Sequence, residues 1–572
     1  MAVVLLVTLA GIWVSYQAFK LLQYRNLARK IGLPYVLSPV GEHDFTWMVL
    51  QKLLAPIFER LPLGLGGFVR FTKRGWNFKD KFKAHQDIGK AFTVVAPSGL
   101  AIHVGDAAAA NSIVSRRKDY LKPLELAKLV DMFGQSVISS EGADWQRHRR
   151  ITAPPFNERN NGLVWSEAIR QSQQLLTYWN ESMSKDIGVN SMLQDASTIA
   201  LNVLMGAGFG TSYAFRDGVD TKLKGFQMTY RTALATCMSD IFMVFVLPPV
   251  LLSLPVLPKK LAKYKIAVAE FRRHLQDMVA AAKARIRNAD AASIDKTDQA
   301  TLLSSLIAKA QEGGSPGTKA EAANTLSDSE IYGNLFMFSF AGHETVAMTL
   351  SYAIYLFAAF PEWQEWVGEE LDYVFRNHTN IETLEYSELY PKLKRCNAVM
   401  HEVLRLYPPA LSIPKTTGDA PASLKVDGKE VTIPPHTHIY PNVIALQTNE
   451  EYWGRDWSVW RPNRWIDSPP DSELTRDAML DSEKLIDAER KGTFLPWAEG
   501  PRVCPGKKFS QVEFVAAIAN ILWKHRISVC PNAGETLPEA RKRAVGVIEN
   551  SGILFTLRIL EPELVRLRIE KK

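Results

Sequence analysis

The sequence predicts a mainly α-helical protein with a minor β component, and three features carry that prediction. Ser327 and Glu330 form a capping-box pattern that opens a stretch of about 30 residues without proline, which Pro361 closes. Apolar residues recur at helical spacing over residues 269–287. β-Branched residues and turn dipeptides are concentrated in two short regions, residues 92–105 and 424–446.

Composition and charge narrow the class of protein further. The chain has 572 residues, of which 47% are hydrophobic and 22% charged, with a net charge of +8. Its four cysteines show no CxxC spacing, which argues against a zinc site, a thioredoxin-like motif and a disulfide framework, and favours a reducing compartment. The chain has no basic tail and no Cys/His finger pattern. A membrane surface or an acidic protein partner accounts for the positive charge as well as nucleic acid would.

The N-terminus predicts a membrane anchor. Residues 1–19 contain no charged side chain, and a segment of this length is near the lower limit for a helix that spans a bilayer. Basic residues follow at once, and positive charge after the span places the rest of the chain in the cytosol. A cleaved signal peptide is the alternative, but the basic n-region and a clean cleavage site are missing. We expect an anchor at 1–22, a basic, proline-bearing linker at 23–45 and one domain at 46–572.

A second apolar stretch, residues 241–258, contains four prolines, and an uninterrupted spanning helix is therefore not expected there. Two interpretations remain open. The stretch is either a buried loop or a loop that dips into the membrane without crossing it.

The long predicted helix contains the sequence AGHET. Phe338, Ala341, Gly342 and Thr345 share one face of it, and Glu344 lies beside that face. Glycine inside a helix costs about 0.5–1 kcal/mol relative to alanine. The hollow face therefore indicates either close packing of another helix or room for a large group.

Two further motifs follow in the C-terminal half. Glu402 and Arg405, at i and i+3 on a predicted helix, form either an ordinary surface pair or, as their apolar neighbours favour, a buried ion pair that Arg464, in the sequence WRPNRW, can join. In WAEGPRVCPG, residues 497–506, Cys504 stands two residues after Arg502 in a turn rich in glycine and proline. Backbone N–H groups in such a turn can stabilise a thiolate.

These motifs, in this order and near these spacings, together with Trp145 and Arg149 in WQRHRR, resemble the cytochrome P-450 superfamily of haem-thiolate monooxygenases. The motifs extend from residue 145 to residue 506. With the anchor, the resemblance is closest to microsomal, filamentous-fungal members. It implies the cytochrome P-450 fold, in which a long central helix lies over the haem beside small β-sheets.

The resemblance also implies roles for individual residues. Cys504 is the expected axial ligand of the haem iron, and the expected partners of the haem propionates are Trp145, Arg149, Arg502 and Lys415, the last standing where the family usually has arginine. Glu402, Arg405 and Arg464 are expected to be structural. Thr345 and Glu344 are expected to handle protons during oxygen activation. Expected substrate contacts are Phe338, Ala341, Leu411 and Ile413.

Two positions depart from the family pattern. Trp497 replaces the usual phenylalanine at the start of the cysteine motif, and Val346 replaces a second threonine after Thr345.

The expected electron donor is a separate protein. The chain has neither a fused flavin domain nor a complete dinucleotide fingerprint, so the resemblance implies NADPH–cytochrome P-450 reductase, with cytochrome b5 as an optional second donor, and no nucleic acid partner. A basic face that would receive this acidic partner is expected from Arg147, Arg150, Lys507 and Lys508. The expected location is the endoplasmic reticulum membrane, with a single span and a cytosolic catalytic domain.

The expected reaction inserts one atom of O2 into a hydrophobic small molecule, in fungal secondary metabolism. An O2-independent haem-thiolate isomerase or dehydratase is the alternative, and a non-catalytic haem sensor is a third. Thr345 and Glu344 favour the first, because the other two need no proton relay for oxygen.

Overall fold

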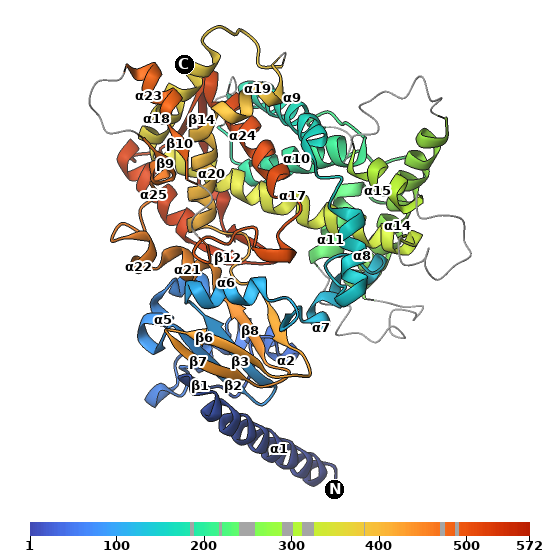
Figure 1. Cartoon of the computed structure of the whole chain (residues 1–572), viewed down its shortest axis with the longest axis vertical. Coiled ribbons are helices and arrows are strands. Elements are labelled where there is room, and N and C mark those ends of the chain that lie inside the picture. The colour runs from blue at the N-terminus through green and yellow to red at the C-terminus, as the bar shows by residue number, and fades with distance from the viewer. Residues whose placement is uncertain are drawn as a thin grey trace.

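A single long helix, α17, crosses the helical part of the molecule in the computed structural model (Figure 1). It runs from Asp328 to Ala359, 32 residues or about 48 Å. The Ser327 hydroxyl oxygen accepts a hydrogen bond from the Glu330 N–H, and the Glu330 carboxylate accepts one from the Ser327 N–H, which completes the predicted capping box. Phe360 caps the C-terminal end of the helix, and Pro361 opens α18 (Pro361–Phe375). The sequence prediction for this helix is confirmed.

The structure describes residues 1–183, 188–216, 220–239, 258–288, 301–311, 325–382, 384–468, 475–486 and 491–572. The proline-bearing stretch at 241–258 lies outside them except for its last residue, so neither interpretation of it is tested.

Four helix pairings build the main core. α10 (Met192–Val203) packs along α17, α24 (Lys507–Lys524) packs on α9 (Glu158–Met183), and α20 (Lys394–Leu406) contacts both α24 and α17. The buried faces of these helices join one large apolar cluster. The cysteine motif and the AGHET sequence thus belong to elements that share one core.

The largest sheet has six strands in the order β1-β2-β3-β8-β5-β4. β1 (Tyr35–Leu37) is parallel to β2 (Ala91–Ala96), which pairs antiparallel with β3 (Gly99–Val104). β8 (His438–Pro441) is parallel to β3 and antiparallel to β5 (Lys415–Thr417), which pairs with β4 (Tyr120–Leu121). The sheet lies between α1 and the helical part (Figure 1).

Antiparallel pairs supply the remaining strands. β6 (Ala422–Val426) and β7 (Lys429–Ile433) meet at Asp427 and Gly428, both with positive φ, as the turn dipeptide predicts. β12 (Ser551–Ile553) pairs with β13 (Leu557–Ile559), and β11 (His525–Val529) with β14 (Leu567–Lys571). The mainly helical fold with small sheets is as predicted.

Further α-helices and one strand pair complete the described regular structure, apart from short 3-10 and π-helical turns. They are α2 (Phe45–Phe58), α3 (Val69–Thr72), α4 (Trp76–Asp80), α5 (Lys83–Ile88), α6 (Ala107–Ser115), α7 (Leu124–Ala127), α8 (Gly142–Thr152), α11 (Tyr230–Ser239), α14 (Lys259–Asn288), α15 (Leu302–Gln311), α19 (Tyr386–Leu389), α21 (Val443–Thr448), α22 (Glu450–Trp453), α23 (Arg476–Ser482), α25 (Leu537–Glu549), β9 (Ile466–Asp467) and β10 (Lys484–Leu485).

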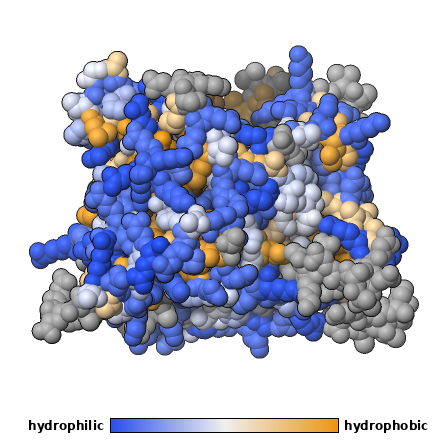
Figure 2. Space-filling model, turned by 90° about the horizontal axis from the view of Figure 1, so that it is seen from above, coloured by the Kyte–Doolittle hydropathy of each residue, from blue (hydrophilic) through white to orange (hydrophobic). Residues whose placement is uncertain are grey.

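The N-terminal helix α1 runs from Ala2 to Ile31, and its segment Val4–Ile31 is long and apolar enough to cross a membrane. It projects from the molecule (Figure 1). The helix continues nine residues past the expected end of the anchor, and Ala28 and Ile31 are buried against the six-stranded sheet. Residues expected to form a linker therefore form the docked turns of α1 and the edge strand β1. The face at the opposite end of the molecule is mainly hydrophilic (Figure 2).

Candidate active site

The cysteine motif forms a tight loop directly before α24. The backbone N–H of Cys504 donates to the carbonyl of Trp497 at 2.9 Å. Ala498 and Gly500 have left-handed backbone angles, φ 56° and 71°. A Cβ on Gly500 would lie 2.6 Å from the Val114 carbonyl of α6, so only glycine lets the loop approach this closely. The cysteine is thereby held on a backbone with little freedom to move.

The sulfur of Cys504 differs from those of the other cysteines. Its side chain is exposed, whereas Cys237 and Cys396 are buried. Burial raises the pKa of Cys237 to about 12 and that of Cys396 well above its usual value. Surrounding protein also raises the pKa of Cys504, but the N–H of Gly506 and the guanidinium of Arg149 oppose that rise by stabilising the thiolate. Cys504 therefore combines an open side chain with groups that favour its ionised form.

Basic side chains gather beside this loop. Among the described residues, Arg502 of the loop, Lys415 of β5 and Lys122 after β4 share the Glu141 carboxylate, and Arg149 of α8 lies close to Arg502 and Cys504. Burial, reinforced by repulsion among these cations, lowers the pKa of Lys122 to about 7 and that of Lys415 to about 8. The cluster carries more positive charge than its own carboxylate neutralises.

Trp145 holds part of this cluster in place. The guanidinium of Arg502 lies 4.4 Å from the centre of the Trp145 ring, and that of Arg117 lies 5.2 Å from it. Arg502 also pairs with Glu141 at 2.6 Å and donates to the carbonyl of Ser140 at 3.1 Å. The expected neighbours Trp145, Arg149, Lys415 and Arg502 are thus brought together.

The predicted buried ion pair is present, and Arg464 joins it. Arg405 donates to both carboxylate oxygens of Glu402 at 2.8 Å, and Arg464 donates to one of them at 2.9 Å. The indole N–H of Trp465 donates to the other oxygen at 2.9 Å. Burial tends to raise the pKa of Glu402, but Arg405 and Arg464 together hold it below its usual value.

Arg405 also binds the backbone of a distant segment. Its Nη1 donates to the carbonyls of Gln447 and Trp457 at 3.0 and 2.7 Å. The pair therefore ties α20 to residues 447–465, which fits the structural role expected for it.

The two residues expected to handle protons lie on different flanks of α17. The Thr345 hydroxyl donates to the Ala341 carbonyl at 3.0 Å. Glu344 accepts a hydrogen bond at 3.0 Å from Thr556, which lies between β12 and β13. Burial raises the pKa of Glu344, while Thr556 and Arg558 oppose the rise. Glu344 therefore points toward the β12–β13 pair and not toward Thr345.

The four expected substrate contacts lie in different surroundings. Ala341 is exposed, in the middle of a largely buried helix. Phe338 packs edge-on against Phe156 at 5.6 Å, and the Phe156 ring lies beside Gly506. Leu411 is buried in the main core, and Ile413 packs on a small cluster that includes Val443 and Leu495. Of the four, Ala341 has the open surface that a ligand contact requires, and the roles of the others stay predictions.

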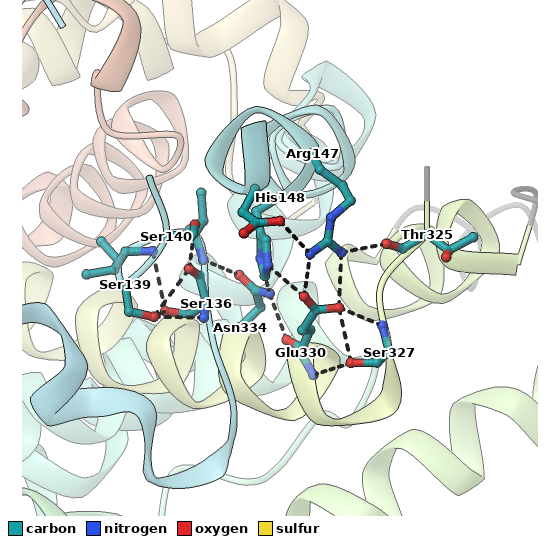
Figure 3. A network of polar contacts seen from close by, with 12 residues as sticks. Ser136, Ser139, Ser140, Arg147, His148, Thr325, Ser327, Glu330 and Asn334 are labelled. Carbon is teal, nitrogen blue, oxygen red and sulfur yellow. Dashed lines mark hydrogen bonds and ion pairs between the residues drawn. The ribbon is translucent and has the colours of Figure 1, made fainter. Parts of the chain in front are cut away.

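A polar network ties α8, α17 and residues 136–141 together (Figure 3). Asn334 of α17 donates to the Glu330 carbonyl at 2.7 Å and accepts from the Val137 N–H at 2.9 Å. Its amide also lies 3.1 Å from Nδ1 of His148, whose Nε2 lies 3.2 Å from the Glu330 carboxylate. Arg147 completes the network by pairing with that carboxylate at 2.5 Å.

Two glycines let the backbones meet at this point. A Cβ on Gly134, whose φ is 138°, would lie 1.9 Å from the Ser329 carbonyl, and a Cβ on Gly333 would lie 2.3 Å from the Gly134 carbonyl. The loop before α8 is therefore in direct backbone contact with the start of α17.

The network corrects one member of the expected basic face. Both terminal nitrogens of Arg147 bind Glu330, and one also donates to the Thr325 carbonyl at 2.7 Å. Arg147 is therefore committed inside the molecule and cannot serve as a surface charge for a partner. The ammonium groups of Lys507 and Lys508 lie over the rings of Trp497 and Tyr390, at 5.2 and 3.7 Å.

Sequence reasoning missed Lys122, Glu141, His148 and Asn334. Lys122 and Glu141 belong to the loop before Trp145 and carry no motif of their own. His148 lies inside the WQRHRR sequence, and Asn334 lies seven residues before Ala341 on α17. The motifs therefore predict the two helices but not the contact between His148 and Asn334. Their partners are up to 186 residues away, a separation that local spacing does not encode.

Comparisons with known proteins agree with this geometry. The family model described as cytochrome P450 matches residues 60–555. A cytochrome P450 monooxygenase of Arthrobotrys oligospora is 31% identical, covering 97% of each chain. Similar enzymes of Penicillium roqueforti, 29% identical over 90% of each chain, and of the phomenoic acid biosynthesis cluster of Leptosphaeria maculans, 28% identical over 95% of each chain, also match.

The chain belongs to the cytochrome P450 family. It is therefore an oxidoreductase of the monooxygenase class, with a haem whose iron takes a cysteine ligand. The residues present fit that group. An exposed sulfur on a rigid loop suits an iron ligand, and a desolvated excess of cations suits two propionate carboxylates.

Proposed function

We propose that this protein inserts one oxygen atom from O2 into a hydrophobic small molecule of fungal secondary metabolism, with electrons from NADPH delivered by a separate reductase. The observation that best supports this proposal is the position of Cys504. Its side chain is exposed on a loop with a constrained backbone, beside basic side chains that outnumber the neighbouring carboxylates. The fungal relatives, one of them named for a biosynthesis cluster, support the metabolic setting.

Cys504 is the proposed iron ligand, and Arg149, Arg502, Lys415 and Lys122 are the proposed partners of the propionates. Bound there, the haem supplies the activation of dioxygen that amino-acid side chains lack. The Gly506 N–H and the Arg149 guanidinium oppose the rise that burial causes in the pKa of Cys504, and so favour the thiolate that iron would bind. Trp145 and Glu141 orient Arg502, so that its guanidinium is positioned before the propionates arrive.

Thr345 and Glu344 divide the handling of protons between two flanks of α17. The Thr345 hydroxyl, beside the exposed Ala341, can hold a water molecule on the face of the helix that carries the reaction. Glu344 holds a proton more readily than an ordinary carboxyl because burial raises its pKa. Since it points toward Thr556, it supplies protons from the neighbouring flank and not by direct contact with Thr345.

The proposed partner is NADPH–cytochrome P-450 reductase, with cytochrome b5 as a second donor, and the proposed location is the endoplasmic reticulum membrane. α1 supports a membrane location because it is long and apolar enough to span a bilayer. With Arg147 committed inside, the proposed docking face keeps Arg150, Lys507 and Lys508.

The absorption spectrum of the membrane-bound protein, reduced with dithionite and exposed to carbon monoxide, tests the site. We expect the long-wavelength Soret band of thiolate ligation, and we expect Cys504→Ser to lose it together with oxygenation. Cys530→Ser is the matched control and should keep both. A wild-type band at the shorter wavelength would remove the thiolate assignment, and full activity of Cys504→Ser would refute it.

A further inference from the structure

A cavity of about 650 Å³ lies between α10, α11, the β12–β13 pair and one flank of α17. On α17 it is lined by Phe340, His343, Glu344 and Met348, at i, i+3, i+4 and i+8. At 100° per residue this flank adjoins the one that carries Ala341 and Thr345. The lining is mostly apolar and includes several leucines. A molecule with a large apolar body fits such a space.

Two arginines line the same cavity, and each has unused hydrogen-bonding capacity. Nε of Arg231, on α11, lies 2.9 Å from the Asp220 carboxylate, but its Nη2 is buried and has no hydrogen-bond partner among the described residues. The half-buried side chain of Arg558, on β13, acts on Glu344 through its charge but makes no hydrogen bond or ion pair with a residue that the structure describes. Buried guanidinium N–H groups without an acceptor are unfavourable, and a ligand oxygen would relieve that cost.

The other polar groups that line the cavity neutralise these arginines only in part. Glu344 is hydrogen-bonded by Thr556, and its pKa is raised by burial, which disfavours its charged form. Glu563 is exposed, at the rim. His343 is neutral, because burial lowers its pKa to about 4, and its Nδ1 is bound to the Ser339 carbonyl at 2.5 Å. Asp220 balances the charge of Arg231 from one side, so the cavity offers the unpartnered Nη2 of Arg231 and the charge of Arg558 within apolar walls.

We propose that this cavity holds the carboxylate end of an apolar acid, with Arg231 as the residue that recognises it and Arg558 as its auxiliary. The inference rests on the proposed function in that the acid is taken to be the substrate. Its carboxylate would lie on one flank of α17 while its apolar body extends to the adjoining flank at Ala341. A guanidinium suits this role because it offers a planar pair of donors to a carboxylate.

Equilibrium binding to the purified, haem-loaded protein tests this proposal without reductase or NADPH. The probes are dodecanoic acid and 1-dodecanol, which share one chain and differ in the charged end, at a pH where the acid is ionised. We expect the wild type to bind the acid about tenfold more tightly than the alcohol, and Arg231→Gln to bring the acid to the affinity of the alcohol. Arg231→Lys should keep part of the preference.

Arg376→Gln is the matched control, because it removes the same charge from the exposed end of α18 and should keep the full preference. Arg558→Gln should reduce the preference for the acid over the alcohol. Because Arg558 lies on β13 and not on α11, this variant still tests the proposal if Arg231→Gln does not fold. Equal affinity of the wild type for acid and alcohol would overturn the proposal, as would an unchanged preference in both Arg231→Gln and Arg558→Gln.

The optical spectrum during the same titration separates this inference from the proposed function. A Soret shift with the acid supports its placement as substrate, because it reports a change at the iron. Tight binding of the acid without a shift would overturn that placement. Absence of NADPH-dependent oxidation would count against the proposed function alone, since the affinities are measured without turnover.

Discussion

The guanidinium of Arg502 lies 4.4 Å from the centre of the Trp145 ring, and this contact joins the cysteine loop to α8. Arg502 lies two residues before Cys504 in the same loop. The Trp145 ring, by holding Arg502, therefore helps to fix the position of the Cys504 sulfur. Cation–π contacts of this kind contribute about 0.5–2 kcal/mol. Trp145 is buried, so its ring also fills space in the core.

Removing the Trp145 ring should weaken haem retention. We expect Trp145→Ala to lower the haem-to-protein ratio several-fold and to lower stability by about 3–5 kcal/mol, because the ring leaves a cavity and frees Arg502. Absorbance at the Soret band relative to protein concentration measures the first effect, and urea unfolding the second. Trp145→Phe keeps an aromatic face and should retain most of the haem. Equal loading of Trp145→Ala and wild type would show that the ring does not position Arg502.

Breaking the buried pair should destabilise the fold more than any surface pair does. Glu402→Ala leaves Arg405 and Arg464 buried without their carboxylate, and we expect a loss of about 3–5 kcal/mol in the free energy of unfolding. Asp477→Asn removes an exposed partner of Arg376 and should cost less than about 1 kcal/mol. Urea unfolding of both variants checks the contrast, and similar losses for the two would contradict it.

The ion pair between Arg147 and Glu330 should make stability depend on pH. Burial tends to raise the pKa of Glu330, but His148 and Arg147 hold it well below its usual 4.5. The folded pKa is depressed, so the stabilisation is present above pH 4.5 and declines as pH falls below it. We expect Glu330→Gln to lose about 1–3 kcal/mol at pH 7 and to approach the wild type as the pH falls below 4.5.

Urea midpoints at pH 7, 5 and 4 measure this dependence. Asp328→Asn, two residues away and paired with Lys283 at the surface, is the control and should change little at any of these pH values. A difference between Glu330→Gln and wild type that stays constant with pH would mean that the carboxylate charge is not what stabilises the network.

Thr345 and Glu344 should give different phenotypes because they lie on different flanks of α17. We expect Thr345→Ala to consume NADPH at a near-normal rate with several-fold less product, since the hydroxyl beside Ala341 is lost. Glu344→Gln should slow NADPH consumption while keeping the product yield per NADPH closer to that of the wild type. The ratio of product to NADPH, measured with reconstituted reductase, checks both. Thr345→Val, which keeps the shape of the side chain, should behave like Thr345→Ala if the hydroxyl is the cause.

Local sequence was enough for some of these features. Ser327, Glu330 and Pro361 mark the ends of α17 because a capping box and a proline act within a few residues, and Asp427-Gly428 marks a hairpin for the same reason. The Glu402–Arg405 pair was predictable because i and i+3 meet on any helix.

Other features depend on contacts that local sequence does not encode. The partner of Arg147 lies 183 residues along the chain, so its side chain was expected on the surface and is found inside. Lys122 joins the basic cluster only because β4 pairs with β5, and no motif marks it. Glu344 was expected beside Thr345, and its partner Thr556 comes from a strand pair 212 residues away. Tertiary packing decides each of these contacts.

The continuity of α1 has a consequence for how the protein moves. The helix passes from its apolar segment into turns docked on the six-stranded sheet, where Ala28 and Ile31 are buried. With α1 set in a bilayer, no flexible tether separates it from the globular part, which cannot tumble freely. Inserted in this way, it would diffuse laterally with its height and tilt restricted by α1. A redox partner held in the same bilayer would then search for it in two dimensions, with the docking face already turned to a constant angle.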